Sequence, residues 1–195
     1  MLRTRIAVLV SGGGTNLQAL IDASKSGIIS SGQIVLVVSD NKEAFALKRA
    51  EEHNITALTM KNEEELIKYL EDNSIELVVL AGFMKILSEK FIKAYENRII
   101  NIHPSLIPSF AGKGCYGIHV HEKVLDYGVK VTGATVHYVN EIPDGGKIIA
   151  QRPVPVMEGD TPETLQKRVM EQAEWIILPR AVEQISKELL KGKEE

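Results

Sequence analysis

Short apolar runs alternate with segments of helical periodicity in the first half of the chain. The runs, at residues 6–10, 34–38, 77–81 and 99–102, predict strands that are buried on both faces, and residues 56–60 add a further short strand. Helical patterns lie between them, at residues 16–26, 44–53, 63–73 and 89–95. Strands alternating with helices imply right-handed crossovers, so the sequence predicts an α/β fold with an open, doubly wound, mostly parallel sheet.

The second half of the chain has a different pattern. Residues 131–139 alternate and are rich in Val, Thr and Tyr, whereas residues 148–156 contain Pro153 and Pro155. Proline confines a strand to an edge or an end of a sheet. Because a Gly-Gly turn connects the two segments, we expect them to form an antiparallel extension of the sheet.

A long helix is predicted at the C-terminus. Thr161 is a suitable N-cap and Pro162 suits the first helical position. We expect this helix to run toward Leu190 with a kink or break at Pro179, and a frayed tail at residues 191–195.

Composition narrows the class of protein. A chain of 195 residues with 44% hydrophobic and 25% charged residues is typical of one soluble globular domain, here spanning residues 1–195. The net charge of −3 argues against a general nucleic-acid binder. Cys115 is the single cysteine, so no intrachain disulfide can form, and no apolar segment approaches the roughly 20 residues needed to span a bilayer. The apolar run at residues 6–10 is too short for a signal peptide, so we expect a cytoplasmic protein that does not bind membranes.

A glycine-rich loop follows the first predicted strand. Gly13 and Gly14 precede Thr15 and Asn16, where a helix begins. Free N–H groups and the positive end of the helix dipole make such a loop a natural seat for one phosphate group. The loop lacks the Lys of a nucleoside-triphosphate loop and has Leu17 where a strict GxGxxG motif needs glycine. A tight turn capped by Thr15 or Asn16 is the plainer alternative.

Asn101 and His103 stand at the end of the strand predicted at residues 99–102. Residues two apart on a strand share a face, so both side chains can point toward one atom beyond the carboxyl end of the sheet, where ligands bind. An Asn amide and a His can donate hydrogen bonds to an oxygen that becomes negative, which is oxyanion stabilisation. A His that is merely hydrogen-bonded is the alternative.

Asp144 is the candidate partner of His103. An Asp followed by Gly145 and Gly146 is also a common turn signal, so a purely structural role is open. If Asp144 folds back beside His103, its charge favours the imidazolium and we expect it to raise the pKa of His103, making that ring a proton donor near neutral pH.

Together these motifs resemble the phosphoribosylglycinamide formyltransferase family. The matching segments, in the order of the family, are residues 11–18 (SGGGTNLQ), 80–87 (LAGFMKIL), 101–106 (NIHPSL) and 144–146 (DGG). The resemblance implies a Rossmann-like fold and two substrates, 10-formyl-tetrahydrofolate as co-substrate and 5-phosphoribosyl-glycinamide. It also implies that Asn101, His103 and Asp144 are the catalytic trio.

The resemblance assigns binding residues as well. The residues implied to hold the sugar phosphate are Gly13, Gly14, Thr15, Asn16, Gln172 and Glu174, the last of these recognising the amine. Those implied to line the folate pocket, besides Asn101 and Asp144, are Met84, Lys85, Ile86, Leu87, Asn140, Glu141, Ile142 and Pro143. Read without the family, Met84, Ile86 and Leu87 could be core and Glu174 could lie on a solvated helix face.

Two departures from the family pattern stand out. Residues 111–117 form a longer stretch than in the best-known members. Many members have Glu-His before an apolar pair and a proline, whereas this chain reads Glu174-Trp175-Ile176-Ile177-Leu178-Pro179, with one residue more.

His119 and His121 lie two apart near a helix start with no third ligand in view, so we expect no metal site.

Three other functions are possible in principle. A formyl-tetrahydrofolate hydrolase would use the same trio but its relatives have a further N-terminal domain. Formylation of methionyl-tRNA normally needs an added C-terminal domain that grips tRNA. A non-catalytic nucleotide-binding module explains the glycine loop but not Asn101 with His103. The sequence leaves open whether the protein is a monomer or a homodimer.

Overall fold

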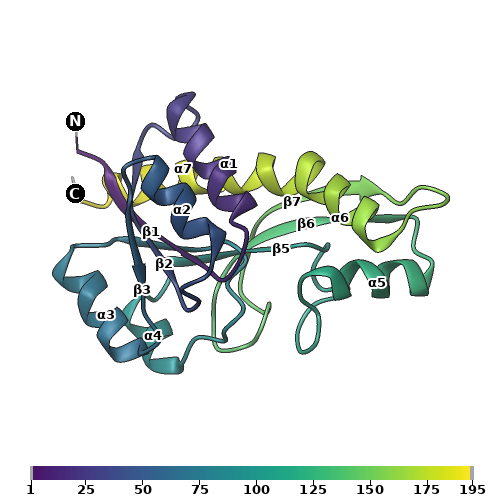
Figure 1. Ribbon diagram of the computed structural model, residues 1–195, viewed down its shortest axis with the longest axis horizontal. Helices are drawn as coiled ribbons and strands as arrows, with labels where there is room; N and C mark the ends of the chain where they lie inside the picture. The colour runs from purple at the N-terminus through teal and green to yellow at the C-terminus, as the bar shows by residue number, and fades with distance from the viewer. Residues whose placement is uncertain (1, 194–195) are drawn as a thin grey trace.

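Seven strands form a single sheet in the computed structural model, which describes residues 2–193. Their order across the sheet is β3-β2-β1-β4-β5-β6-β7 (Figure 1). The strands are β1 (Thr4–Val10), β2 (Gly32–Ser39), β3 (Thr56–Thr59), β4 (Leu77–Leu80), β5 (Ile99–His103), β6 (Val131–Tyr138) and β7 (Ile148–Pro155). The first five run parallel, whereas β6 and β7 pair antiparallel at one side. The predicted fold class is confirmed, including the antiparallel extension.

Helices cover both faces of the parallel part of the sheet. They are α1 (Thr15–Lys25), α2 (Phe45–Glu52), α3 (Glu63–Asp72), α4 (Glu89–Ala94), α5 (Ile118–Tyr127), α6 (Pro162–Val169), the π-helix η1 (Met170–Glu174) and α7 (Trp175–Lys191). In Figure 1, α1, α2 and α7 lie on one side of the sheet and α3 with α4 on the other. The sequence predicted α1 to α4 and the C-terminal helical region, whereas for α5 it indicated only the start of the helix.

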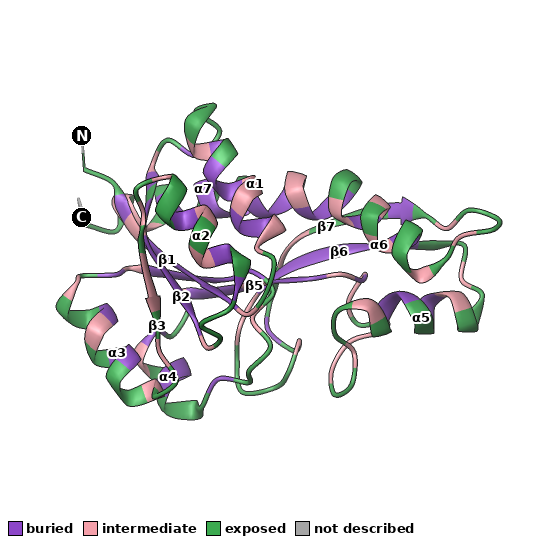
Figure 2. Ribbon diagram, in the orientation of Figure 1, coloured by how far each residue is buried: buried purple, intermediate pink, exposed green. Residues whose placement is uncertain are grey.

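The two helical layers explain why β1 is apolar throughout. Ile6, Val8 and Val10 belong to the buried cluster that includes α1 and α7. Ala7 and Leu9, which point the other way, belong to the cluster that includes α3 and α4. Figure 2 shows the resulting buried strands between more exposed helices. A strand covered on both faces has no solvent side on which polar residues would be tolerated.

The C-terminal helix differs from the prediction. Its irregularity is the π-helix η1, and Pro179 lies inside the following helix α7 without ending it. Proline removes the N–H that would bond to the carbonyl four residues earlier, here that of Trp175 at the start of α7. The disturbance therefore falls one turn before the proline, where the chain already takes the wider π turn.

Other expectations for this region can be compared with the structure. Thr161 caps α6 as predicted, forming a reciprocal capping box with Thr164. Lys191 still belongs to α7, and of the tail predicted to fray, residues 194 and 195 lie outside the described residues. Within residues 2–193, every helix is too short or too polar to cross a bilayer.

Candidate active site

A cleft with about 580 Å³ of space opens where β1, β4 and β5 end. Asn101 and His103 line it from β5, and Asp144 lines it from the turn between β6 and β7. The size lies within the usual range for small-molecule sites, roughly 300–1,000 Å³. The carboxyl rim of the sheet is the place where doubly wound folds bind ligands.

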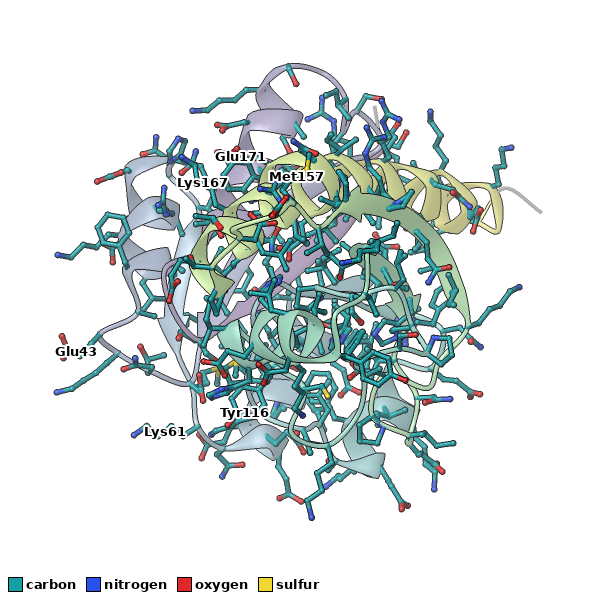
Figure 3. The ribbon with its side chains drawn as sticks, turned by 90° about the vertical axis from the view of Figure 1, so that its right-hand side faces the viewer. Glu43, Lys61, Tyr116, Met157, Lys167 and Glu171 are labelled. Carbon is teal, nitrogen blue, oxygen red and sulfur yellow. The ribbon has the colours of Figure 1, made fainter. Side chains whose placement is uncertain are left out.

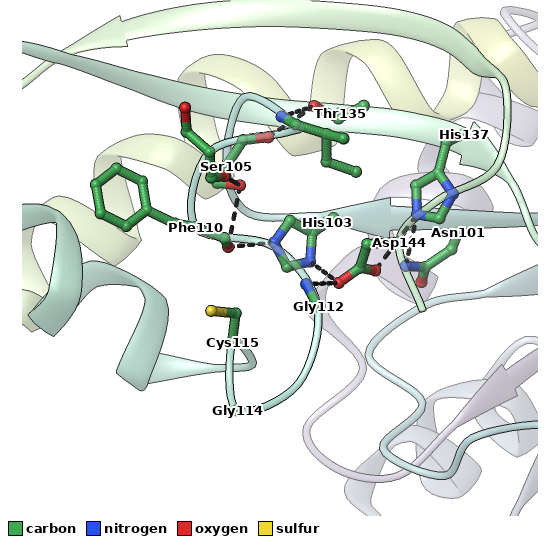
Figure 4. A network of polar contacts seen from close by, with 12 residues as sticks. Asn101, His103, Ser105, Phe110, Gly112, Gly114, Cys115, Thr135, His137 and Asp144 are labelled. Carbon is green, nitrogen blue, oxygen red and sulfur yellow. Dashed lines mark hydrogen bonds and ion pairs between the residues drawn. The ribbon is translucent and has the colours of Figure 1, made fainter. Parts of the chain in front are cut away.

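The structure brings His103 and Asp144 together. Asp144 Oδ2 lies 3.6 Å from His103 Nδ1 and accepts a 2.8 Å hydrogen bond from the Gly112 N–H (Figure 4). On the other side of the ring, His103 Nε2 lies 2.9 Å from the Phe110 carbonyl oxygen, which can only accept, so Nε2 carries a hydrogen. Asp144 has a φ of 56°, as expected of a turn residue. It is therefore both the turn residue and the neighbour of His103.

The expected pKa shift of His103 is wrong in direction. Asp144 does favour the charged ring, but burial is the larger influence and lowers the pKa of His103 below its usual value. Burial likewise disfavours the ionised form of Asp144, yet a hydrogen bond from the His137 ring when that ring is protonated, the charge of His103 and the Gly112 N–H together outweigh it and lower the pKa of Asp144. The pair at rest is therefore a carboxylate beside an imidazole that is mainly neutral at pH 7.

His137 is a site residue that sequence analysis missed. It lies on β6 directly opposite Asn101, and its Nε2 is 3.2 Å from Asn101 Nδ2 and 3.6 Å from Asp144 Oδ1. Its side chain is only 2% exposed. The available signal was a histidine within an otherwise apolar and Thr-rich strand, two positions from Thr135.

The glycine loop forms the start of α1 without a side-chain cap. Gly14 is the N-cap with φ 72°, so the alternative of a turn capped by Thr15 or Asn16 is not what the structure shows. A Cβ on Gly14 would lie 2.6 Å from the Cβ of Ala46, which explains the need for glycine. Thr15 and Asn16 line the cleft, whereas Gly13 and Gly14 form the turn that leads to them.

A cation that sequence analysis did not single out lies beside this loop. Arg49 donates from Nε to the Gly13 carbonyl at 2.9 Å and from Nη1 to Gln18 Oε1 at 3.0 Å. Its place on α2 makes it a neighbour of the loop only after folding. The guanidinium adds positive charge next to the helix N-terminus that was predicted to hold phosphate.

Glu174 is buried in the cleft wall, so the solvated-face reading is wrong. It is 6% exposed and accepts a 2.7 Å hydrogen bond from Asn16 Nδ2. Burial raises the pKa of Glu174 to about 7, although the bond from Asn16 acts in the opposite direction. The π-helix η1 ends at Glu174. Such π turns often occur at functional sites.

Gln172 is not part of the cleft, contrary to the prediction. It is exposed, and its backbone carbonyl accepts a hydrogen bond from Arg152 Nε. Two residues along a helix change direction by about half a turn, so Gln172 and Glu174 cannot face the same ligand. Figure 3 shows the neighbouring Lys167 and Glu171 on the outer surface, where their charges lie 3.9 Å apart.

The segment predicted to line the folate pocket is largely open to the cleft. Met84 is 52% and Ile86 81% exposed, so the core reading fails for both, whereas Leu87 is 7% exposed and does belong to the core. Lys85 lies 3.9 Å from Asp40. All four residues line the cleft.

The turn at residues 140–144 forms another wall of the same cleft. Asn140 Oδ1 accepts a 3.0 Å hydrogen bond from the Ile142 N–H, which holds the turn in shape. Ile142 is 65% exposed and, with Met84 and Ile86, forms an exposed apolar part of the cleft lining. The predicted residues that line the cleft here are Asn140, Glu141, Ile142, Pro143 and Asp144.

The long stretch at residues 111–117 also lines the cleft. Through Gly112 it holds Asp144, and Lys123 Nζ ties it to α5 by donating to the Gly114 carbonyl at 2.8 Å and to Cys115 Sγ at 3.2 Å. The Tyr116 ring packs edge-on against His119, with the two ring centroids 5.2 Å apart. The stretch thus connects the cleft wall to the His103–Asp144 pair.

His119 and His121 point in different directions, as the spacing predicted. His119 pairs with Glu122 at 2.7 Å on the surface, whereas His121 is fully buried in the cleft wall and burial lowers its pKa to about 4. Among residues 2–193 there is no group of three or more His, Cys, Asp or Glu side chains that could hold a metal ion.

Comparisons with known proteins agree with this geometry. A family model described as "Formyl transferase" matches residues 4–182. A trifunctional purine biosynthetic protein adenosine-3 from Gallus gallus is 44% identical over 94% of this chain, which spans only 18% of that protein. A phosphoribosylglycinamide formyltransferase from Haemophilus influenzae is 38% identical, with 97% of this chain and 91% of the relative covered. The crystal structure of glycinamide ribonucleotide transformylase 1 from Symbiobacterium toebii superimposes with a TM-score of 0.88 at 39% identity, covering 95% of this chain and 88% of that one.

Proposed function

Because the chain belongs to the formyl transferase family, we propose that it transfers a formyl group from 10-formyl-tetrahydrofolate to the amine of 5-phosphoribosyl-glycinamide. The products are formylglycinamide ribonucleotide and tetrahydrofolate, within de novo purine biosynthesis. One observation carries the proposal: Asn101, His103 and Asp144, which are distant in sequence, line one cleft beside a glycine loop. The names of the relatives support the choice of substrates.

The cleft offers separate places for the two substrates. The phosphate is proposed to bind at the N-terminus of α1, near Thr15 and Arg49, where positive charge gathers. The amine-bearing end of this substrate would then lie near the buried pair of Asn16 and Glu174. The folate ring is proposed to bind between residues 84–87 and 140–144, covering the exposed apolar side chains there.

The proposed reaction is direct attack, with no covalent intermediate on the protein. The unprotonated amine attacks the formyl carbon, and the formyl oxygen becomes negative. Asn101 donates a hydrogen bond to that oxygen. His103, mainly neutral at rest, takes up a proton from solvent as the negative charge develops beside it, because both the oxyanion and Asp144 favour the imidazolium, and it returns that proton to solvent when the formyl carbonyl re-forms. The amine proton passes through water held at Asp144 to the folate nitrogen that leaves.

Two effects supply most of the proposed rate. A donor to the oxyanion typically contributes about 2.7–4 kcal/mol, because it acts in a site from which water is largely excluded. Holding two substrates in line can contribute on the order of 7–11 kcal/mol. The burial that lowers the pKa of His103 is the same burial that strengthens these charge interactions.

One experiment separates this proposal from hydrolysis of the folate. The protein is incubated with 10-formyl-tetrahydrofolate, with and without 5-phosphoribosyl-glycinamide, and both tetrahydrofolate and the formylated amine are measured. We expect tetrahydrofolate to form only with the amine present, in a one-to-one ratio to the formylated product. Release of tetrahydrofolate at the same rate without the amine would instead identify a hydrolase.

A further inference from the structure

The buried histidine behind Asn101 has no task in the proposed reaction. We infer that His137 is a positioning residue that determines which end of the Asn101 amide faces the formyl oxygen. It does so by accepting a hydrogen bond from the amide nitrogen, so that the amide presents an N–H to the reacting oxygen. The inference rests on the proposed function, because it concerns the same site.

The two residues are neighbours across the sheet. Asn101 on β5 lies directly opposite His137 on β6 in an antiparallel pair, so their side chains project from the same face. The His137 ring is 2% exposed, and Figure 4 shows it beside both Asn101 and Asp144. A ring this deeply buried has little freedom to exchange its partners.

The partner of the other ring nitrogen identifies the tautomer. His137 Nδ1 lies 2.8 Å from the Tyr138 carbonyl oxygen. A carbonyl can only accept, so Nδ1 must carry the hydrogen, and in a neutral ring Nε2 then has only a lone pair. The group of Asn101 that lies 3.2 Å from Nε2 must therefore be the NH₂. The amide oxygen in that place would set two lone pairs against each other.

Asp144 competes with Asn101 for His137 Nε2. Its Oδ1 lies 3.6 Å from that nitrogen, beyond the usual N–H···O range of about 2.7–3.2 Å, whereas the Asn101 nitrogen is nearer. The other carboxylate oxygen is occupied by the Gly112 N–H. A doubly protonated ring would turn Nε2–H toward Asp144 and repel the amide NH₂. The two arrangements therefore differ in the protonation of Nε2.

The consequence for the reaction is directional. An amide NH₂ has two hydrogens, of which His137 takes one and leaves the other for the formyl oxygen. If the amide turned over, its carbonyl oxygen would face an oxygen that is becoming negative. Removing a donor to an oxyanion costs roughly 10²–10³-fold in kcat. An amide free to take both orientations retains part of the effect, so we expect a loss of about 10- to 100-fold.

The kinetic test compares two substitutions in two backgrounds. His137→Leu removes the acceptor, whereas the amide oxygen of His137→Gln can reach the place of Nε2. We expect His137→Leu to lower kcat about 10- to 100-fold with KM for both substrates within about twofold, and His137→Gln to recover at least about fivefold of that loss. In an Asn101→Ala background, His137→Leu should change kcat less than about twofold. An equal loss in that background, or no recovery with Gln, would overturn the inference.

A spectroscopic test needs no activity. The ¹⁵N spectrum of histidine-labelled wild-type protein at pH 7, with the His137 signals assigned by their absence from His137→Gln, should show Nδ1 protonated and Nε2 unprotonated. A spectrum with Nε2 protonated would refute the inference even if catalysis is as proposed. Conversely, a wild-type protein that shows this tautomer but transfers no formyl group would count against the proposed function alone. If His137→Leu does not fold, as judged by thermal unfolding, this spectrum and His137→Gln still decide.

Discussion

Replacing Asp144 with Asn removes one charge while keeping an oxygen that can accept from the Gly112 N–H. The charge lies 3.6 Å from His103 Nδ1. At that separation the Coulomb energy is about 1 kcal/mol with the dielectric constant of water and about 5 kcal/mol with an effective value near 20. Removing this charge takes away an influence that favours the imidazolium, so the pKa of His103, already lowered by burial, should fall further.

Without the charge of Asp144, protonating His103 costs more free energy as the oxyanion forms. We expect Asp144→Asn to lower kcat at least about 100-fold, the scale of a group that acts in acid–base or oxyanion chemistry. The assay combines single-turnover formyl transfer at pH 7 with an NMR titration of the His103 ring in both proteins. Asp72→Asn is a matched control, because Asp72 is an exposed partner of Lys68 on α3 and should leave turnover unchanged.

Two results would refute this reasoning. Near-normal turnover of Asp144→Asn would show that the carboxylate is not needed, whatever its distance from His103. If the pKa of His103 stays the same or rises in the variant, the Asp144 carboxylate does not favour the imidazolium in the wild-type protein. The first outcome would leave Asp144 as a turn residue only.

Further predictions concern binding and stability. Between about pH 4.5 and 7 the folded protein holds a proton on Glu174 that the unfolded chain releases, so stability falls as pH rises through this window. Glu174→Gln should therefore unfold at a higher temperature than wild type at pH 8, and its KM for the sugar phosphate should be at least about tenfold higher. Equal melting temperatures would contradict the buried carboxyl. Gly14→Ala should lose about 1–2 kcal/mol of unfolding free energy in urea titrations and bind the sugar phosphate weakly, because its φ is 72° and Ala46 is in the way, whereas Gly13→Ala, with open space around it, is the control and should lose less. Glu183 accepts hydrogen bonds from the backbone and hydroxyl groups of two serines, which lower its pKa to about 2. Glu183→Gln should therefore lose about 1–3 kcal/mol of unfolding free energy at pH 7, and its difference from wild type should shrink as pH falls from about 4.5 toward 2. A difference independent of pH would count against a role for the carboxylate charge.

Much of the fold could be predicted because local patterns and the layers of the sheet require the same residues. The uninterrupted apolar run of β1 demanded cover on both faces, and Ile6 and Ala7 do pack into different clusters. The prolines of β7 indicated an edge strand, and it is the last strand of the sheet. The length of α5 was not predicted, and the effect of Pro179 was placed one turn too late. Boundaries depend on packing that local patterns do not record.

At the site, the sequence determined which side chains meet, and the tertiary structure decided their state. Strand ends were enough to place Asn101 and His103 at one rim, whereas it was the family resemblance that implied Asp144 as their partner. The pKa of His103 depends on how much water burial removes, which is set by the whole fold and outweighs the adjacent charge. His137 and Arg49 reach the site from β6 and α2, through sheet pairing and helix packing that bring distant residues together. Proximity across the sheet, and the loss of water that accompanies it, exist only once the chain has folded.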